Sequence, residues 1–210
     1  MLCFVKRLLA RLVDGISRVG RPGKRRLYVA VYDVGFTQSR TNSGIDPATE
    51  CPIRHMNAPR AQYHWDLMVG PKKERREPVA GLRFRVSFSK TRGWFYTEKT
   101  VTDVRTPYKM LVRLLVGKIE DMDRLVTMTR TTPIPQNDPY FRSYDWVATV
   151  LERVDADGTV VGDAVLDWET IEMTARRFIE TKALQGRFGR EALGLPQPMW
   201  SMLEDREVLP

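Results

Sequence analysis

Strand-like segments fill the first half of this 210-residue sequence, and helical segments fill the second half. Runs of β-branched and aromatic residues, several with polar and apolar positions alternating, predict strands. Apolar residues at helical spacing predict helices, and strands followed by helices predict an α+β domain whose antiparallel sheet packs against helices. The predicted strands are 27–34, 63–70, 81–89, 93–101 and 110–119, and the predicted helices are 120–130, 140–158 and 167–186.

Capping residues indicate where two of the helices begin. Asn137 or Asp138 is expected to cap the helix 140–158, with Pro139 in its first turn. The last helix is expected to begin at Asp167 and to end at Gly186.

Length and charge predict one domain behind a basic extension. With 42% hydrophobic residues, 210 residues can bury one sizeable core, so residues 27–210 are expected to form a single domain. Residues 1–26 carry eight basic residues and one acid, which is +7 of the net charge of +8, and their apolar residues recur at helical spacing. Such an amphipathic basic arm favours contact with phosphate on RNA or on an anionic membrane surface, while a solvated tail is the alternative. The candidate RNA-binding residues are Arg21, Lys24, Arg25 and Arg26.

Several classes of protein are disfavoured by the same sequence. Charges interrupt every apolar run of the arm, and no other segment reaches the length of a membrane span, which argues against secretion and against a membrane protein. Cys3 and Cys51 fit no disulfide or metal-ligand spacing, which indicates a reducing, cytoplasmic setting. His55 and His64 are the two histidines, which makes a zinc site improbable. We expect no metal and no other cofactor.

One strand carries the residues with the most chemical potential. His64 and Asp66 are two positions apart in the strand 63–70, so they share a face, and Trp65 is expected to point the opposite way into packing. Ser143 lies near the start of the helix 140–158, where backbone N–H groups converge. A serine facing a histidine there has the geometry of acyl transfer, with imidazole as base and amides around an oxyanion. We therefore expect His64 and Ser143 to face one another across a cleft; a satisfied polar pair in a core is the alternative for His64 and Asp66.

Two motifs resemble known families. The stretch "YHWDLMVG" (63–70) looks like the His-Trp-Ala-x-x-Val-Gly strand of the lecithin:retinol acyltransferase and NlpC-like group, which are circularly permuted papain-like proteins. Those proteins continue with Asn-Cys-x-x-Phe-Val at the start of a helix, where this chain has "RSYDWV" (142–147), with Ser143 at the place of the cysteine. The resemblance implies a permuted papain-like domain.

The segments 110–125, 133–147 and 167–188 also resemble a set of small fungal proteins that we associate with the arginine-containing cyclodipeptide synthases. Those enzymes take aminoacyl groups from transfer RNA and join them into a cyclic dipeptide of natural-product biosynthesis. The resemblance implies a transferase that uses arginyl-tRNA and a second aminoacyl-tRNA, with His64 as base and Ser143 as the acyl acceptor. Asp66 would bind the arginyl guanidinium or orient His64, and the remaining substrate-binding candidates are Arg85, Asp145 and Trp146.

Two departures from these patterns leave other functions open. Ser143 is a poorer nucleophile than cysteine at neutral pH, and Arg85, near the place of a second histidine in the acyltransferases, cannot act as a base. The site is therefore retuned to serine, inactivated by a natural or engineered exchange, or never catalytic. The alternatives are a papain-like hydrolase or acyltransferase acting on a peptide or lipid ester, with the arm on a membrane, and a pseudoenzyme that binds without reacting.

Overall fold

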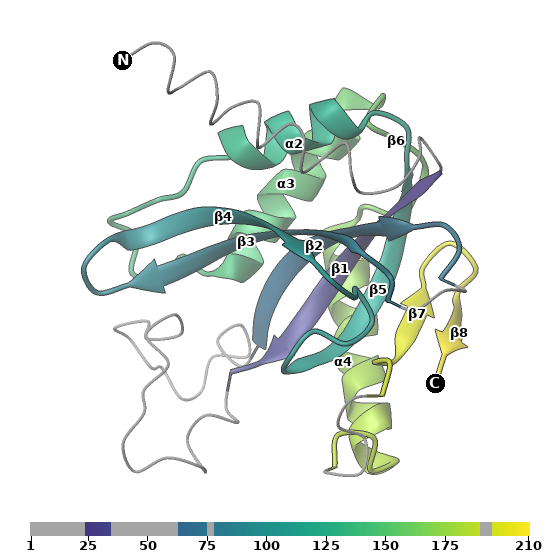
Figure 1. The fold of residues 1–210 in the computed structure, drawn as a ribbon. Coiled ribbons are helices and arrows are strands. Elements are labelled where there is room, and N and C mark those ends of the chain that lie inside the picture. The colour runs from purple at the N-terminus through teal and green to yellow at the C-terminus, as the bar shows by residue number, and fades with distance from the viewer. Residues whose placement is uncertain (1–23, 35–62, 75–77, 190–194) are drawn as a thin grey trace.

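An eight-stranded sheet with helices packed against it forms the protein (Figure 1). The structure, a computed structural model, describes residues 24–34, 63–74, 78–189 and 195–210. The strands are β1 (Arg25–Asp33), β2 (Tyr63–Pro71), β3 (Gly81–Ser89), β4 (Gly93–Val101), β5 (Met110–Ile119), β6 (Val161–Ala164), β7 (Met199–Ser201) and β8 (Arg206–Leu209). The helices of the described residues are α2 (Met122–Thr131), α3 (Ser143–Asp157) and α4 (Trp168–Leu184).

The sheet is mostly antiparallel, with the strand order β4-β3-β2-β1-β5-β7-β8 and with β6 paired to β5. The pair of β5 and β7 is parallel. β1 lies between β2 and β5, so the prediction that the first strand shares a sheet with 63–70 is confirmed. The α+β class is confirmed as well. β1 begins two residues earlier than predicted, so Arg25 and Arg26 are strand residues and not part of a preceding arm.

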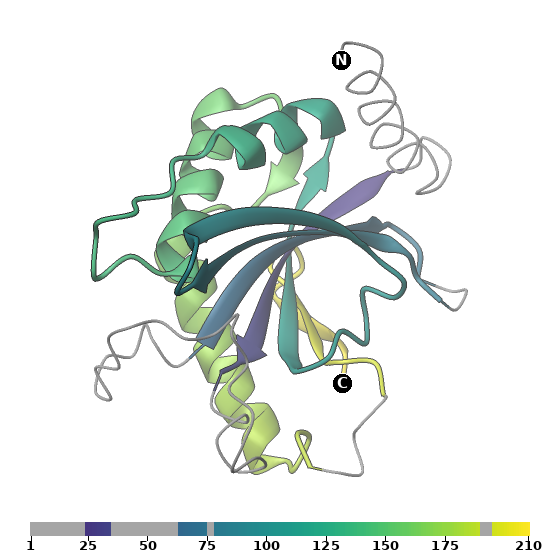
Figure 2. The same ribbon diagram turned by 60° about the vertical axis from the view of Figure 1, so that its left-hand side comes forward.

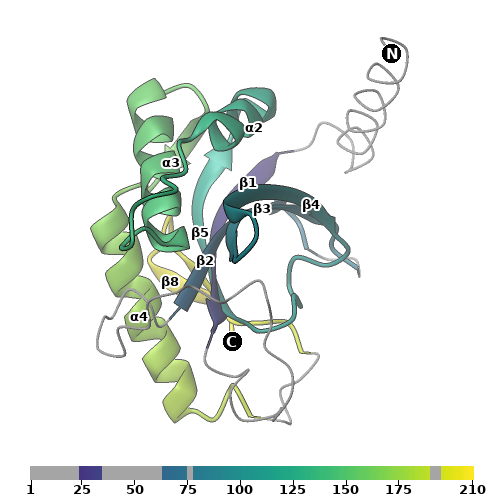
Figure 3. The ribbon, with the colours of Figure 1, turned by 90° about the vertical axis from the view of Figure 1, so that its left-hand side faces the viewer.

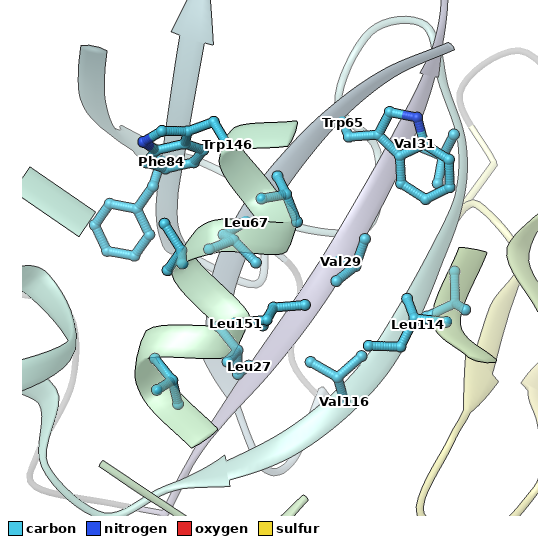
Figure 4. Packing of buried hydrophobic residues seen from close by; sticks show 14 of the residues in the cluster. Leu27, Val29, Val31, Trp65, Leu67, Phe84, Leu114, Val116, Trp146 and Leu151 are labelled. Atoms are coloured by element: carbon cyan, nitrogen blue, oxygen red, sulfur yellow. The ribbon is translucent and has the colours of Figure 1, made fainter. Parts of the chain in front are cut away.

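The two faces of the sheet have different surroundings. All three helices cover one face, here called the helix face, and the sheet curves away from them, so that its other face, the inner face, lies on the inside of the curve (Figures 2 and 3). Alternation along the strands sorts the side chains between these faces. On the helix face, residues of β1 and β2 join residues of α3 in the main core (Figure 4), among them Leu27, Val29, Val31, Trp65, Leu67 and Leu151. On the inner face, Tyr28, Ala30 and Tyr32 of β1 form a separate cluster with Met68 of β2.

Side-chain caps begin two of the helices. Asp121 accepts a hydrogen bond from the backbone N–H of Arg124 at the start of α2, and Asp167 accepts one from Thr170 at the start of α4. The predicted start of the last helix is therefore confirmed, and Gly186 follows its end with φ 70°.

The predicted start of the middle helix was wrong. Asp138 accepts a hydrogen bond from the backbone N–H of Tyr140 and so closes a turn before the helix begins. The N-cap of α3 is Arg142, whose backbone N–H donates to Asp145 (2.7 Å). The helix therefore begins at Ser143, and neither Asn137 nor Pro139 belongs to its first turn.

Other expectations fall on different parts of the chain. The amphipathic helix expected in the basic arm lies outside the described residues. β6, β7 and β8 were not predicted, because each is only three or four residues long. No helix in the described part of the chain is long and apolar enough to cross a membrane.

Candidate functional site

β2 places His64 and Asp66 on the inner face. Trp65 points to the helix face, as predicted, where its ring packs edge to face against Tyr144 of α3 (6.0 Å between centroids) and against Trp168 of α4 (5.1 Å). His64 lies beside Tyr32 of β1, its partner in the strand pairing. The shared face expected for His64 and Asp66 is therefore present, and it is the face away from the helices.

Asp66 is the centre of a buried polar cluster. Its carboxylate is fully buried, and its Oδ1 lies 2.8 Å from Nε2 of His64. Nε of Arg85 donates to both carboxylate oxygens at 3.1 Å, and Nε of Arg83 lies 3.6 Å from Oδ2. β3, next to β2, supplies both arginines from alternate positions on one face. The arginine side chains are 19% and 22% exposed for Arg83 and Arg85.

Tyr32 of β1 also belongs to this cluster, and the sequence analysis did not identify it as a site residue. The guanidinium carbons of Arg83 and Arg85 lie 5.6 Å and 5.3 Å from the centre of its ring, within the range of a cation–π contact. Burial raises the pKa of Tyr32, and the Asp66 carboxylate adds to this effect, so the phenol stays protonated. Alternation in "LYVAVYDV" puts Tyr32 on one face of β1, but nothing in that stretch indicates that β3 would place arginines over it.

The charges of the cluster favour an ionised carboxylate beside a neutral imidazole. Burial lowers the pKa of His64, and although Asp66 opposes that effect, the pKa remains below its ordinary value of 6.5. Burial would raise the pKa of Asp66, but Arg85, His64 and Arg83 together hold it below its ordinary value. At neutral pH the neutral His64 therefore carries its proton on Nε2 and donates it to Asp66, and Nδ1 keeps a lone pair.

Ser143 does not face His64, which corrects our expectation of a facing pair. Its hydroxyl is buried and accepts a hydrogen bond from the backbone N–H of Trp65 (3.0 Å). α3 approaches β2 from the helix face, whereas the imidazole is bonded to Asp66 on the inner face. Among the hydrogen bonds of the described residues, none joins Ser143 to His64.

The remaining predicted substrate-binding residues, Asp145 and Trp146, belong to the first turns of α3. Trp146 is fully buried in the core of the helix face, beside Tyr96, and Asp145 caps α3. Trp146 therefore lies on the opposite face of the sheet from Asp66, although both were predicted to bind substrate.

Of the predicted RNA-binding residues, Lys24 is exposed, Arg25 is half-buried and Arg26 is buried, while Arg21 lies outside the described residues. A direct contact with RNA is therefore open to Lys24 more than to Arg26. In the described part of the chain, no three His, Cys, Asp or Glu side chains are grouped so that they could hold a metal ion.

Comparison with known proteins identifies the family of this chain but assigns it no activity. The model of a family of unknown function, DUF6914, matches residues 24–209, so the chain belongs to this family. No curated protein and no solved structure matches the chain.

Proposed function

We propose that this DUF6914 protein catalyses acyl transfer with His64 as a general base. The observation that carries the proposal is the buried Asp66 carboxylate, which holds a neutral imidazole by Nε2 in a strand that also faces two arginines. A buried ion cluster adds less to stability than apolar packing of the same volume, and departures from apolar burial are expected at functional sites. The cluster therefore favours a chemical role over a purely structural one.

Orientation of the imidazole supports the base role. A carboxylate that accepts the N–H of one ring nitrogen fixes the tautomer and directs the other nitrogen toward substrate, as in hydrolases that use a histidine and an aspartate. The lowered pKa of His64 keeps the imidazole unprotonated, and therefore able to accept a proton, at neutral pH.

The arginines support a substrate that develops negative charge. The guanidinium groups of Arg83 and Arg85 both lie at the buried Asp66 carboxylate, on the same face of the sheet as His64. A fixed positive charge near the reacting carbon stabilises the oxyanion that forms when a nucleophile attacks an acyl group.

The nucleophile that best fits this geometry belongs to the substrate. Because Ser143 bonds to the backbone of Trp65, we propose direct attack by a substrate amine on the acyl carbon. Nδ1 of His64 takes the amine proton as the C–N bond forms, and returns it to the leaving oxygen as the C–O bond breaks. An activated ester needs little further help in such a step.

Aminoacyl-tRNA is the ester that the resemblance of the sequence suggests. A tRNA-dependent synthesis of an arginine-containing cyclic dipeptide is consistent with a base on one strand and an exposed basic residue, Lys24, directly before β1. A permuted papain-like relationship is part of the same proposal, supported by a histidine strand that precedes a helix beginning at Ser143. Mass spectrometry of extracts from cells that express the protein should find new arginine-containing cyclic dipeptides, and their absence under good expression would count against this substrate.

A binding module without catalysis is the second candidate. Both carboxylate oxygens of Asp66 accept hydrogen bonds from side chains of the protein, as they would in a cluster with a purely structural role. The effect of a His64 substitution on the rate of dipeptide formation distinguishes a binding module from an enzyme.

The decisive variants are His64→Gln and Ser143→Ala. We expect His64→Gln to lower the rate of dipeptide formation by at least about 100-fold, because general bases contribute about 10² to 10⁴ in rate. Ser143→Ala should keep about the wild-type rate and form no acyl-enzyme by intact-protein mass spectrometry. Loss of activity in Ser143→Ala, together with an acyl group on Ser143 of the wild-type protein, would instead establish the serine as nucleophile.

A further inference from the structure

A second charged cluster lies on the inner face, built around Arg113 of β5. Arg113 pairs with Ala30 of β1, and Ala30 pairs with Asp66 of β2, so the three residues form one row across the sheet. Residues opposite one another in antiparallel strands share a face. Arg113 therefore lies two strand spacings, about 10 Å, from Asp66.

The cluster has the donor arrangement of a carboxylate-binding site. Both terminal nitrogens of Arg113 donate to Glu74, at 2.6 Å and 2.5 Å, and the hydroxyl of Tyr28 donates to the same carboxylate at 3.0 Å. The Arg113 guanidinium stacks over the Tyr28 ring with 5.1 Å to its centre. A planar guanidinium fork with a tyrosine hydroxyl beside it is well suited to bidentate recognition of a carboxylate.

The donors and the acceptor come from different kinds of structure. Arg113 and Tyr28 are buried on neighbouring strands of the sheet, whereas Glu74 follows the end of β2 in the connection to β3 and is 15% exposed. The strands therefore hold the two donor side chains in place, whereas the carboxylate of Glu74 that they bind comes from a connecting segment.

Arg113 is not fully satisfied by Glu74. Its side chain is fully buried, and its Nε has no hydrogen-bond partner in the described structure. Arginine cannot lose its charge in a protein, so a buried donor of this kind has a strong demand for an anionic acceptor. Burial, with Glu74 adding to its effect, raises the pKa of Tyr28, so this hydroxyl remains a donor.

We propose that Arg113 and Tyr28 form a binding site for the carboxylate of an organic acid, which Glu74 fills in the absence of ligand. The proposal rests on the proposed acyl transfer and specifies its substrate class: a molecule whose carboxylate lies more than about 10 Å from the group that reacts at His64, because His64 is two residues beyond the row of Asp66 and Arg113. Binding of the ligand carboxylate to the Arg113 fork displaces Glu74 from it.

Substitution of Glu74 removes the internal competitor. Glu74→Gln keeps the size of the side chain but removes its charge, so we expect this variant to bind succinate at least tenfold more tightly than the wild-type protein. Succinamide, the neutral match of succinate, should bind to neither protein, and the added substitution Arg113→Met should abolish succinate binding. Isothermal titration calorimetry measures all of these affinities.

Glu98→Gln is the matched control, because Glu98 also accepts from an arginine fork and a tyrosine hydroxyl, those of Arg130 and Tyr96. Arg130 is 45% exposed, so its charge is solvated and the control variant should gain no affinity for succinate. If Glu74→Gln unfolds, Glu74→Asp keeps the charge but withdraws it from the fork, and should gain affinity instead.

The proposal is overturned if folded Glu74 variants bind succinate no better than the wild-type protein, or if binding survives Arg113→Met. The double variant Glu74→Gln/His64→Gln tests whether succinate affinity depends on the residue proposed as general base. Succinate binding does not depend on His64, so an inactive His64 cluster leaves the carboxylate site standing, and the reverse also holds.

Discussion

At the scale of single residues, the account depends on Asp66. This carboxylate is fully buried and accepts hydrogen bonds from His64 and Arg85, and the guanidinium group of Arg83 lies nearby. Loss of its charge would leave two guanidinium groups near one another in a mostly buried setting without their shared counter-charge. Asp66 should therefore be needed for stability as well as for the orientation of His64.

Replacing Asp66 with asparagine tests the stability role. We expect Asp66→Asn to lower the free energy of unfolding by about 3 kcal/mol, because it removes the buried carboxylate charge that His64 and Arg85 bind and that Arg83 approaches. Urea denaturation measures the change. The control is Asp163→Asn, which removes the exposed ion pair with Lys118 and should change stability little, because exposed ion pairs contribute little. Equal losses in the two variants would show that Asp66 has no special role.

The lowered pKa of His64 predicts a pH dependence of stability. Below pH 6.5 the unfolded chain binds a proton at this histidine that the folded protein resists, so stability falls as the pH drops from 6.5 toward the lowered folded pKa. His64→Gln should remove this part of the fall in melting temperature. An unchanged slope in that variant would mean that the folded pKa is not lowered.

At the scale of elements, α3 joins the sheet to the rest of the helix layer. Its first residue, Ser143, bonds to β2, and its apolar side packs into the core of the helix face. Its C-cap is Gly158 in the left-handed region (φ 68°), where the Cβ of another residue would meet no neighbouring atom but would strain the backbone.

Gly158→Ala isolates that backbone strain. We expect the substitution to lower the free energy of unfolding by about 1 kcal/mol, because an L-residue in the left-handed region costs about 1 to 2 kcal/mol. Thermal denaturation gives the measurement. A neutral or stabilising effect would mean that α3 ends in a different conformation.

The strands and their faces were predictable, but their partners were not. Alternation in "YHWDLMVG" correctly placed His64 and Asp66 on one face and Trp65 on the other. The arginines over Asp66 depend on the register between β2 and β3, which no local pattern specifies. The position of Ser143 depends on which face α3 covers, and packing of Trp65 and Leu67 in the core decides that.

At the scale of the whole molecule, the C-terminal segment closes the fold. β7 pairs in parallel with β5, and β8 carries Glu207 to the buried amine of Lys182 in α4 (2.5 Å). These contacts join the last strands, which were not predicted from the sequence, to the sheet and to α4.

Glu207→Gln tests this closure. We expect a loss of about 2 kcal/mol of folding free energy, because Lys182 would be left buried without its carboxylate while Gln185 still accepts from it. The control is Glu204→Gln, at the exposed ion pair with Arg206, which should be close to neutral. Guanidinium denaturation compares the two, and equal small losses would show that the C-terminal segment does not contribute through Lys182.

The central claim is that His64 is a neutral base held by Asp66, and nitrogen NMR of the imidazole tests it most directly. The chain has only two histidines, His55 and His64, so His64→Gln assigns the signals. We predict that His64 titrates below pH 6.5 and that its neutral form carries the proton on Nε2. A His64 that titrates at or above pH 6.5, or that carries its proton on Nδ1 when neutral, would contradict the account.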